Sequence, residues 1–289
     1  MDTREIAENI VSHLDGFGIP NLLWGQTAPL YHLGLLSSPG TKQGVVEIAV
    51  SEHKIDDACK HICAKYFVSQ CGDAGCYPEP RPDYHFHVKE HRPDSEWTIV
   101  SLHKITTVLT DLPTQIPNIP KPGDSNYILV TDTRLPKYSG DGSSGNCQRT
   151  LGVNKGKSTV RILTLARHTE SLILRLCLNL DTDNAPIFFK AIEEIVDYYG
   201  ENTQRTDIWK QLLCDLDDKN DNYGYYLNKQ KNEWKHERPN AQSWQDVPMR
   251  NLRRSGERQR HAKRLREKLV DDGKLTSTRD RDSLTGRHA

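Results

Sequence analysis

Two short apolar runs, separated by a glycine, constrain the fold of this chain more than any other feature. The first covers residues 19–24 and ends at Gly25, and the second covers residues 45–50 with Glu47 near its middle. Within the second run, β-branched residues alternate with Glu47 and Ala49, which is typical of a strand whose two faces differ. The sequence therefore predicts two strands of one sheet, with a glycine turn and a short helix between them.

The remaining elements of the N-terminal half follow from the same patterns. Apolar residues at helical spacing predict a second helix near 52–68 and a first helix that Gly16 and Gly18 close, with Ile6, Ile10, Val11, Leu14 and Phe17 on its apolar face. Runs rich in β-forming residues predict an edge strand at 84–88 and a further strand at 97–103. Residues 111–158 are rich in Pro, Gly and Ser, so we interpret them as an insertion with one strand at 126–135.

From about residue 160 the apolar period changes from that of strands to that of helices. Three helices with apolar faces are expected before residue 226, after which the apolar content falls. The predicted fold class is α/β (α+β), with a small mixed sheet, flanking helices, a helical half and a basic tail. The predicted domains are an α/β core (1–110), the insertion (111–158), a helical region (159–230) and a tail, largely extended or singly helical (231–289).

Charge is distributed unevenly although the net charge is zero. Residues 231–289 carry 16 Lys and Arg against 9 Asp and Glu, a balance of +7, and the rest of the chain carries −7. An acidic body with a basic tail predicts polyanion binding by the tail. The candidate cations are Arg253, Arg254, Arg258, Arg260, Lys263, Arg264, Arg266 and Lys268. A solvated helix paired through Glu257 and Glu267, or a nuclear-import signal, would explain the same run.

Several classes of protein are not indicated by the sequence. No stretch approaches the roughly 18 apolar residues of a membrane span, and the N-terminus lacks the layout of a signal peptide. Seven cysteines at irregular spacing suit reduced thiols better than a disulfide framework. We therefore expect an intracellular protein, cytoplasmic or nuclear, with no membrane partner.

Two glycine motifs lack the context of a nucleotide site. The run from Gly140 to Gly145 spells G-x-G-x-x-G, but Pro136 precedes it and a polar loop follows, so a surface loop explains it better. The run 156–158 reads Gly-Lys-Ser, but Leu151 stands where a phosphate-binding loop needs glycine.

Four residues could supply thiolate and imidazole ligands to zinc: Cys71, Cys76, His85 and His87. His85 and His87 would lie on one face of a strand. The spacing does not match the tight knuckles of structural zinc sites, so ordinary surface residues are the alternative.

The run Ile19-Pro20 through Leu23-Trp24-Gly25, with Ala28 and Gly34, resembles a fungal family of uncharacterised proteins with a predicted nucleotidyltransferase fold. The block from Val160 to Leu165, leading into Glu170-Ser171-Leu172-Ile173, is similar to the strand-to-helix transition with which the helical half of those proteins begins. The resemblance extends over residues 5 to about 216 and is weak between 70 and 158. It implies a nucleotide site at Gly25, Gln26 and Thr27.

The resemblance also implies a metal-dependent chemistry. Nucleotidyl transfer uses two metal ions, which the family holds with acids two residues apart on a strand, because such side chains share a face. Glu47 takes the first position, as catalytic residue and Mg²⁺ ligand, but Ala49 takes the second. Asp94 and Glu96 stand at the start of the 97–103 strand, where a further acid is expected.

The leading hypothesis is therefore a nucleotidyltransferase-fold protein that binds a nucleotide or nucleic acid with weak or no catalysis, a possible pseudoenzyme. One alternative is a non-catalytic interaction protein with an acidic body and a basic tail. The other is an active Mg²⁺-dependent nucleotidyltransferase that uses Glu47 with an acid from elsewhere in the chain.

Overall fold

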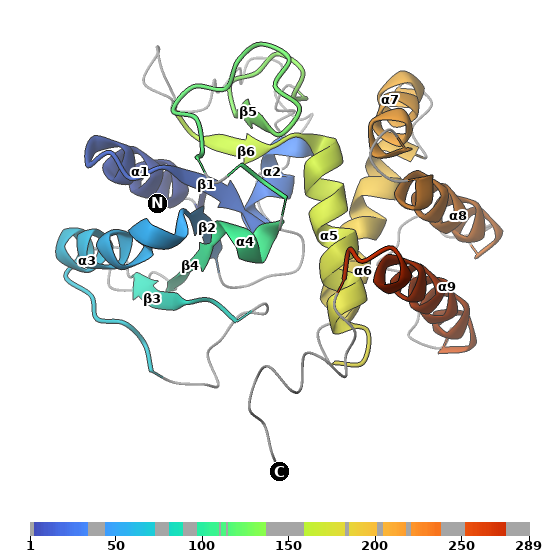
Figure 1. The fold of residues 1–289 in the computed structure, drawn as a ribbon. Helices are drawn as coiled ribbons and strands as arrows, with labels where there is room; N and C mark the ends of the chain where they lie inside the picture. Colours follow the sequence, from blue (N-terminus) through green and yellow to red (C-terminus); the bar gives the residue numbers. More distant parts are fainter. Residues whose placement is uncertain are drawn as a thin grey trace, which may run out of the picture. The chain divides into compact units, whose positions relative to one another are not determined.

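The structure is a computed structural model of the 289-residue chain. It describes residues 3–33, 44–72, 81–88, 97–109, 111–113, 115–136, 159–182, 185–200, 205–217, 221–237 and 252–275. The chain divides into two compact units, Met1–His168 and Thr169–Ala289. The first unit contains the sheet, and the second is helical in its described residues (Figure 1).

Six strands form one mixed sheet, in the order β3-β4-β2-β1-β6-β5 (Figure 1). The strands are β1 (Asn21–Trp24), β2 (Val45–Val50), β3 (Tyr84–Val88), β4 (Thr98–Lys104), β5 (Tyr127–Leu129) and β6 (Arg161–Leu163). β2 is antiparallel to β1 and parallel to β4, whereas β6 is parallel to β1. The prediction that the glycine-ended strand, the Glu47 strand and the 97–103 strand share a sheet is confirmed, and β3 is an edge strand as expected.

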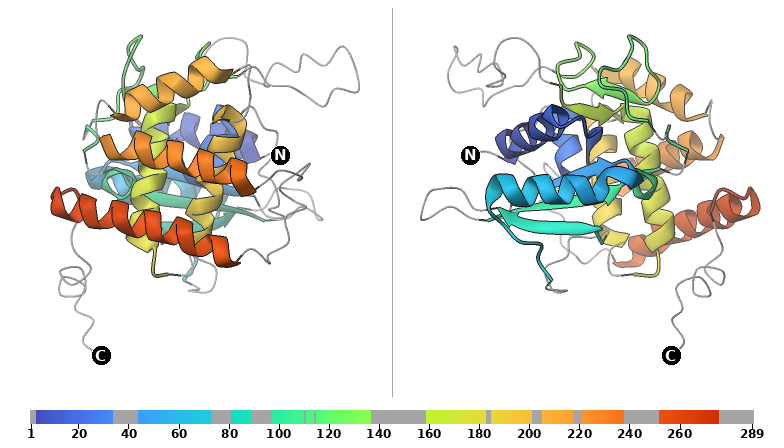
Figure 2. Two further views of the ribbon diagram at one scale, coloured as in Figure 1. Left: turned by 90° about the vertical axis from the view of Figure 1, so that its right-hand side faces the viewer. Right: turned by 60° about the vertical axis from the view of Figure 1, so that its left-hand side comes forward.

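One face of the sheet is apolar and packs against two helices, α1 (Thr3–Gly16) and α3 (Ile55–Tyr66) (Figure 2). The core on this face is a continuous cluster to which the helices and the central strands contribute Ile10, Leu14, Ile62, Leu23, Ile48 and Val100. Burial of these side chains is worth about 1.5–3 kcal/mol each. The strand alternation read from the sequence therefore has a physical cause, because every second residue of β2 enters this core.

The turns of this unit depend on left-handed residues. After α1, Gly18 adopts a φ of +64°, and backbone bonds from Gly18 and Ile19 to the end of the helix close the turn into β1. Phe17, expected on the apolar face of the helix, is 55% exposed and stacks on His61 of α3. The helix therefore ends one residue before its apolar pattern does.

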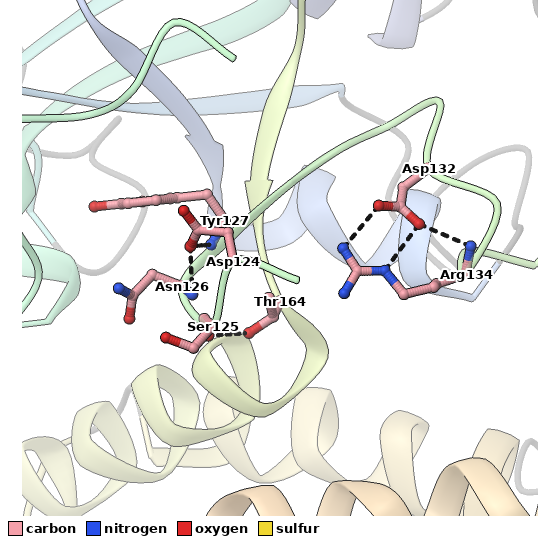
Figure 3. A network of polar contacts seen from close by, with 7 residues as sticks. All are labelled: Asp124, Ser125, Asn126, Tyr127, Asp132, Arg134 and Thr164. Carbon is pink, nitrogen blue, oxygen red and sulfur yellow. Dashed lines mark hydrogen bonds and ion pairs between the residues drawn. The ribbon is translucent and has the colours of Figure 1, made fainter. Parts of the chain in front are cut away.

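The insertion joins the sheet through β5, which pairs with β6. Polar contacts fix the start of β5 (Figure 3). The Asp124 carboxylate accepts hydrogen bonds from the backbone N–H groups of Asn126 (2.8 Å) and Tyr127 (3.0 Å). The Thr164 hydroxyl donates to the backbone carbonyl of Ser125 at 3.0 Å. The start of β5 is thus tied to the residue between β6 and the following helix.

The strand predicted over 126–135 is shorter in the structure, because a turn ends it. The N–H of Asp132 donates to the carbonyl of Leu129, and the Asp132 carboxylate holds Arg134 through its backbone N–H and its guanidinium (Figure 3). Aspartate readily accepts local backbone bonds of this kind. The remaining residues of the run therefore form a turn.

Helices dominate the second half of the chain, as expected from the change of period near residue 160. They are α5 (Leu165–Asn179), which begins in the first unit, α6 (Ala185–Ile195), a π-helical turn (Val196–Gly200), α7 (Thr206–Asp217), α8 (Asp221–Glu237) and α9 (Leu252–Asp271). The run 160–163 contains β6, and Ile162 enters the sheet core. The strand-to-helix transition that the resemblance implied is therefore present, although the apolar period alone placed the change to helix near residue 160. Among the described residues, no helix is both long and apolar enough to cross a membrane.

The basic run of the tail lies in α9, and this helix makes packing contacts. α9 lies beside α8 (Figure 2), and its residues Ala262, Leu265 and Leu269 are buried. Their spacing, i, i+3 and i+7, gives α9 a narrow apolar stripe. Within residues 252–271 the tail is therefore a helix that packs through this stripe.

Candidate functional site

Gly25 and the Glu47 side chain lie directly beside each other. Trp24 is the residue of β1 opposite Glu47 in β2, and Gly25 follows it with a φ of +63°. A Cβ atom added at Gly25 would lie only 1.8 Å from the Glu47 Oε2 atom. Glycine is therefore required at position 25 for two reasons: the backbone there is left-handed, and the carboxylate occupies the space beside the Cα atom.

The Glu47 carboxylate is buried on the sheet face opposite the apolar core, with an exposed fraction of 1%. Its Oε1 atom lies 3.7 Å from the Nε2 atom of His103 in β4. The His103 ring in turn makes an edge contact with Trp24, at 5.0 Å between ring centroids. The sequence did not indicate that His103 and Trp24 lie beside Glu47. Their positions follow from the strand register.

The register explains which side chains accompany Glu47 on this face. Ser101 of β4 is opposite Glu47, and His85 of β3 is opposite Ser101. Ala49 is opposite His103. This face is therefore buried and polar over the three strands β2, β4 and β3, whereas the other face of the same strands is apolar.

These residues do not fit a two-Mg²⁺ centre. Mg²⁺ prefers oxygen ligands in octahedral geometry, and the positions nearest Glu47 on the ladder carry a histidine, a serine and Ala49. Among the described residues, Glu47 belongs to no group of three or more potential metal ligands. Asp94 and Glu96, the acids expected to help Glu47, lie outside the described residues.

The predicted nucleotide-binding residues form a short 3-10 turn, Gly25–Thr27, which leads into α2 (Ala28–His32). Thr27 is buried, and its hydroxyl donates to the backbone carbonyl of Val45 at 2.6 Å. Thr27 thus joins the turn to β2, which is a structural role. Gly25 is partly exposed, whereas the side chain of Gln26 is outside what the structure describes.

A pair of buried histidines lies where α2 ends and α5 begins. The rings of His32 and His168 stack at 5.3 Å between centroids. Burial lowers the pKa of His32 to about 4. Burial, and then the neighbouring His32, lower the pKa of His168 well below its ordinary value. Both rings are therefore neutral near pH 7, and nothing in the sequence pattern distinguished them from surface histidines.

A second candidate site is a groove between α8 and α9, with a volume of about 170 Å³. Its lining residues are Asn222, Tyr225, Tyr226, Lys229, His261, Arg264, Leu265 and Lys268, and none of these described residues is acidic. Tyr225 is 68% exposed, and the Lys229 Nζ atom lies 5.9 Å from the centroid of its ring. We call this feature the α8–α9 groove.

The structure separates the predicted polyanion-binding cations whose side chains it describes into three groups. Arg264 and Lys268 line the α8–α9 groove, and Lys268 also donates to the Asn222 side chain. Arg266 instead forms an ion pair with Asp181 at 2.8 Å, and Arg260 and Lys263 are exposed on α9 without lining the groove. The side chains of Arg253, Arg254 and Arg258 are outside the described part, although their backbone belongs to α9.

Comparisons with known proteins give one structural likeness. No protein-family model matches the sequence, and no curated protein matches it either. The fold is similar to that in the crystal structure of an antigenic nucleotidyltransferase-like protein from Paracoccidioides brasiliensis. The TM-score is 0.42 at 10% sequence identity, over 78% of this chain and 92% of that chain.

Proposed function

We propose that this chain is a nucleotidyltransferase-fold protein that binds nucleic acid or nucleotides and does not catalyse metal-dependent nucleotidyl transfer. The proposal that the chain binds nucleic acid or nucleotides rests on the α8–α9 groove, which combines cations with an exposed aromatic ring. Phosphates are bound by Lys and Arg, and bases stack on aromatic faces, so the two features together suit a single-stranded nucleic acid.

The lack of transfer is supported by the surroundings of Glu47. Its carboxylate is buried, faces a histidine and shares its strand face with Ala49. A lone acid of this kind can fix the Gly25 turn, but it cannot share two metal ions with a second strand carboxylate. The Gly25 site is in this proposal a retained architectural element, and the phosphate contacts are made elsewhere.

Neutralising the groove should weaken nucleic-acid binding. For a fluorescein-labelled single-stranded oligodeoxynucleotide of mixed sequence, three phosphate contacts predict that a fourfold rise in salt weakens binding roughly 20-fold. The double variant Arg264→Gln/Lys268→Gln should lower the slope of log K against log salt by about 0.7 for each cation removed. Tyr225→Ala should weaken binding by roughly tenfold, because one stacking contact is lost. Fluorescence anisotropy of the full chain measures both effects.

Lys263→Gln is the matched control, since Lys263 is an exposed cation of the same helix that does not line the groove. If this control weakens binding as much as the groove variants, nucleic acid binds through the overall positive charge of α9, and the α8–α9 groove is not the binding site. Equal binding of heparin and of the oligonucleotide, unaffected by Tyr225→Ala, would favour the non-catalytic interaction protein.

A further inference from the structure

Three potential metal ligands converge at the edge of the sheet, where strand β4 separates them from Glu47 in β2. The Sγ atom of Cys71 and one ring nitrogen each of His85 and His87 all lie within 4.8 Å of one another. His85 and His87 alternate with core residues of β3, so both rings project from the face opposite the apolar core. Cys71 comes from the segment that follows α3.

The backbone fixes this convergence. The N–H of Cys71 donates to the carbonyl of His85 at 3.0 Å, which ties the segment after α3 to the edge strand. The two histidines are held by their pairing with β4, where His85 is opposite Ser101 and His87 is opposite Ile99. The three ligands therefore belong to two backbone segments in register with each other, and their proximity does not depend on flexible side chains alone.

The chemistry and accessibility of the group suit a metal ion. The Nε2 atom of His87 is buried and has no hydrogen-bond partner among the described residues. Cys71 and His87 are partly exposed as whole residues, so an ion can reach the group from solvent. A tetrahedral ion with bonds of about 2.0–2.3 Å holds its N and S ligands roughly 3.5 Å apart, and the three ligand atoms here lie within 4.8 Å of one another.

The geometry points to a zinc site formed by Cys71, His85 and His87. Thiolate and imidazole are ligands that Zn²⁺ takes in proteins, whereas Mg²⁺ and Ca²⁺ prefer oxygen. Three protein ligands leave the fourth tetrahedral position to water or to another donor. Cys76, the fourth candidate of the sequence analysis, lies outside the described residues and is not needed for the inference.

Metal binding to the full-length protein tests this assignment directly. We expect about one zinc ion per chain after purification without chelators, and a chelator should lower the melting temperature, because zinc binds the folded state. Titration of the metal-free protein with Co²⁺ should produce a thiolate-to-cobalt charge-transfer band that Zn²⁺ abolishes. Cys71→Ser should remove this band, and both Cys71→Ser and His87→Asn should raise the Kd for Zn²⁺ at least about 100-fold.

The matched controls are Cys59→Ser and His53→Asn, which change the same residue types outside the group. Both should keep the cobalt band and the zinc affinity within a few-fold of the unmodified protein. The inference is overturned if the unmodified protein gives no charge-transfer band, or if Cys71→Ser and His87→Asn bind zinc like the controls. Because the band is read first in the unmodified protein, the test does not depend on how well the variants fold.

Discussion

Replacing Arg161 by Met should lower the free energy of unfolding by about 3 kcal/mol, since removal of one partner of a buried ion pair costs several kcal/mol. Arg161 is 1% exposed, and its guanidinium holds three segments together. Nε donates to the carbonyl of Asn21 in β1 at 3.0 Å, Nη1 donates to the carbonyl of Asn118 at 3.0 Å, and Nη2 pairs with Asp15 of α1. Methionine fills part of the volume but satisfies none of these acceptors.

The matched control for this change is Arg134→Met. Arg134 also forms an ion pair with an aspartate, Asp132, but its side chain is 52% exposed, so the loss should be at most about 1 kcal/mol. Urea unfolding of the two variants measures the difference. A loss at Arg161 no greater than that at Arg134 would contradict a structural role for the buried guanidinium.

Gly25→Ala should be the second large effect, with a loss of about 2–3 kcal/mol. A left-handed alanine costs roughly 1–2 kcal/mol, and the new methyl group would also displace the Glu47 carboxylate from its position beside His103. Gly18→Ala supplies the control, because Gly18 has almost the same φ, +64° against +63°, and nothing lies within 4 Å of an added Cβ.

A double-mutant cycle isolates the carboxylate contact. In a Glu47→Ala background, Gly25→Ala should cost no more than Gly18→Ala, since only the backbone strain remains. Chemical denaturation of the four proteins of the cycle gives the coupling energy. Equal costs of Gly25→Ala with and without Glu47 would mean that the two residues do not meet as described.

The strands and most helices could be predicted from the sequence because their patterns are local. The alternation in β2 and the helical spacing in α1 and α3 arise from residues that enter one shared core, so a period reveals them. The apolar period alone did not reveal β6, because it is a three-residue strand directly before α5 and so short a run shows no periodicity. The packing of α9 was missed because its apolar stripe is narrow and surrounded by cations.

The candidate site was predictable only in part, for a related reason. Gly25 and Glu47 belong to consecutive strands, so their meeting follows from a simple antiparallel pairing. His103 and Ser101 reach Glu47 through the parallel pairing of β2 with β4, a non-local register that a sequence does not display. The Cys71, His85 and His87 group likewise depends on which segment lies along the edge strand.

Nucleotidyl transfer by the purified full-length protein tests the central claim most directly. The protein is incubated with α-labelled nucleoside triphosphates, Mg²⁺ and nucleic-acid acceptors, beside a Glu47→Gln variant. We expect no magnesium-dependent incorporation above the level of the variant, although the oligonucleotide binds, because Glu47 is the only acid of its strand face and Ala49 takes the second position. Magnesium-dependent transfer by the unmodified protein that Glu47→Gln abolishes would contradict the account.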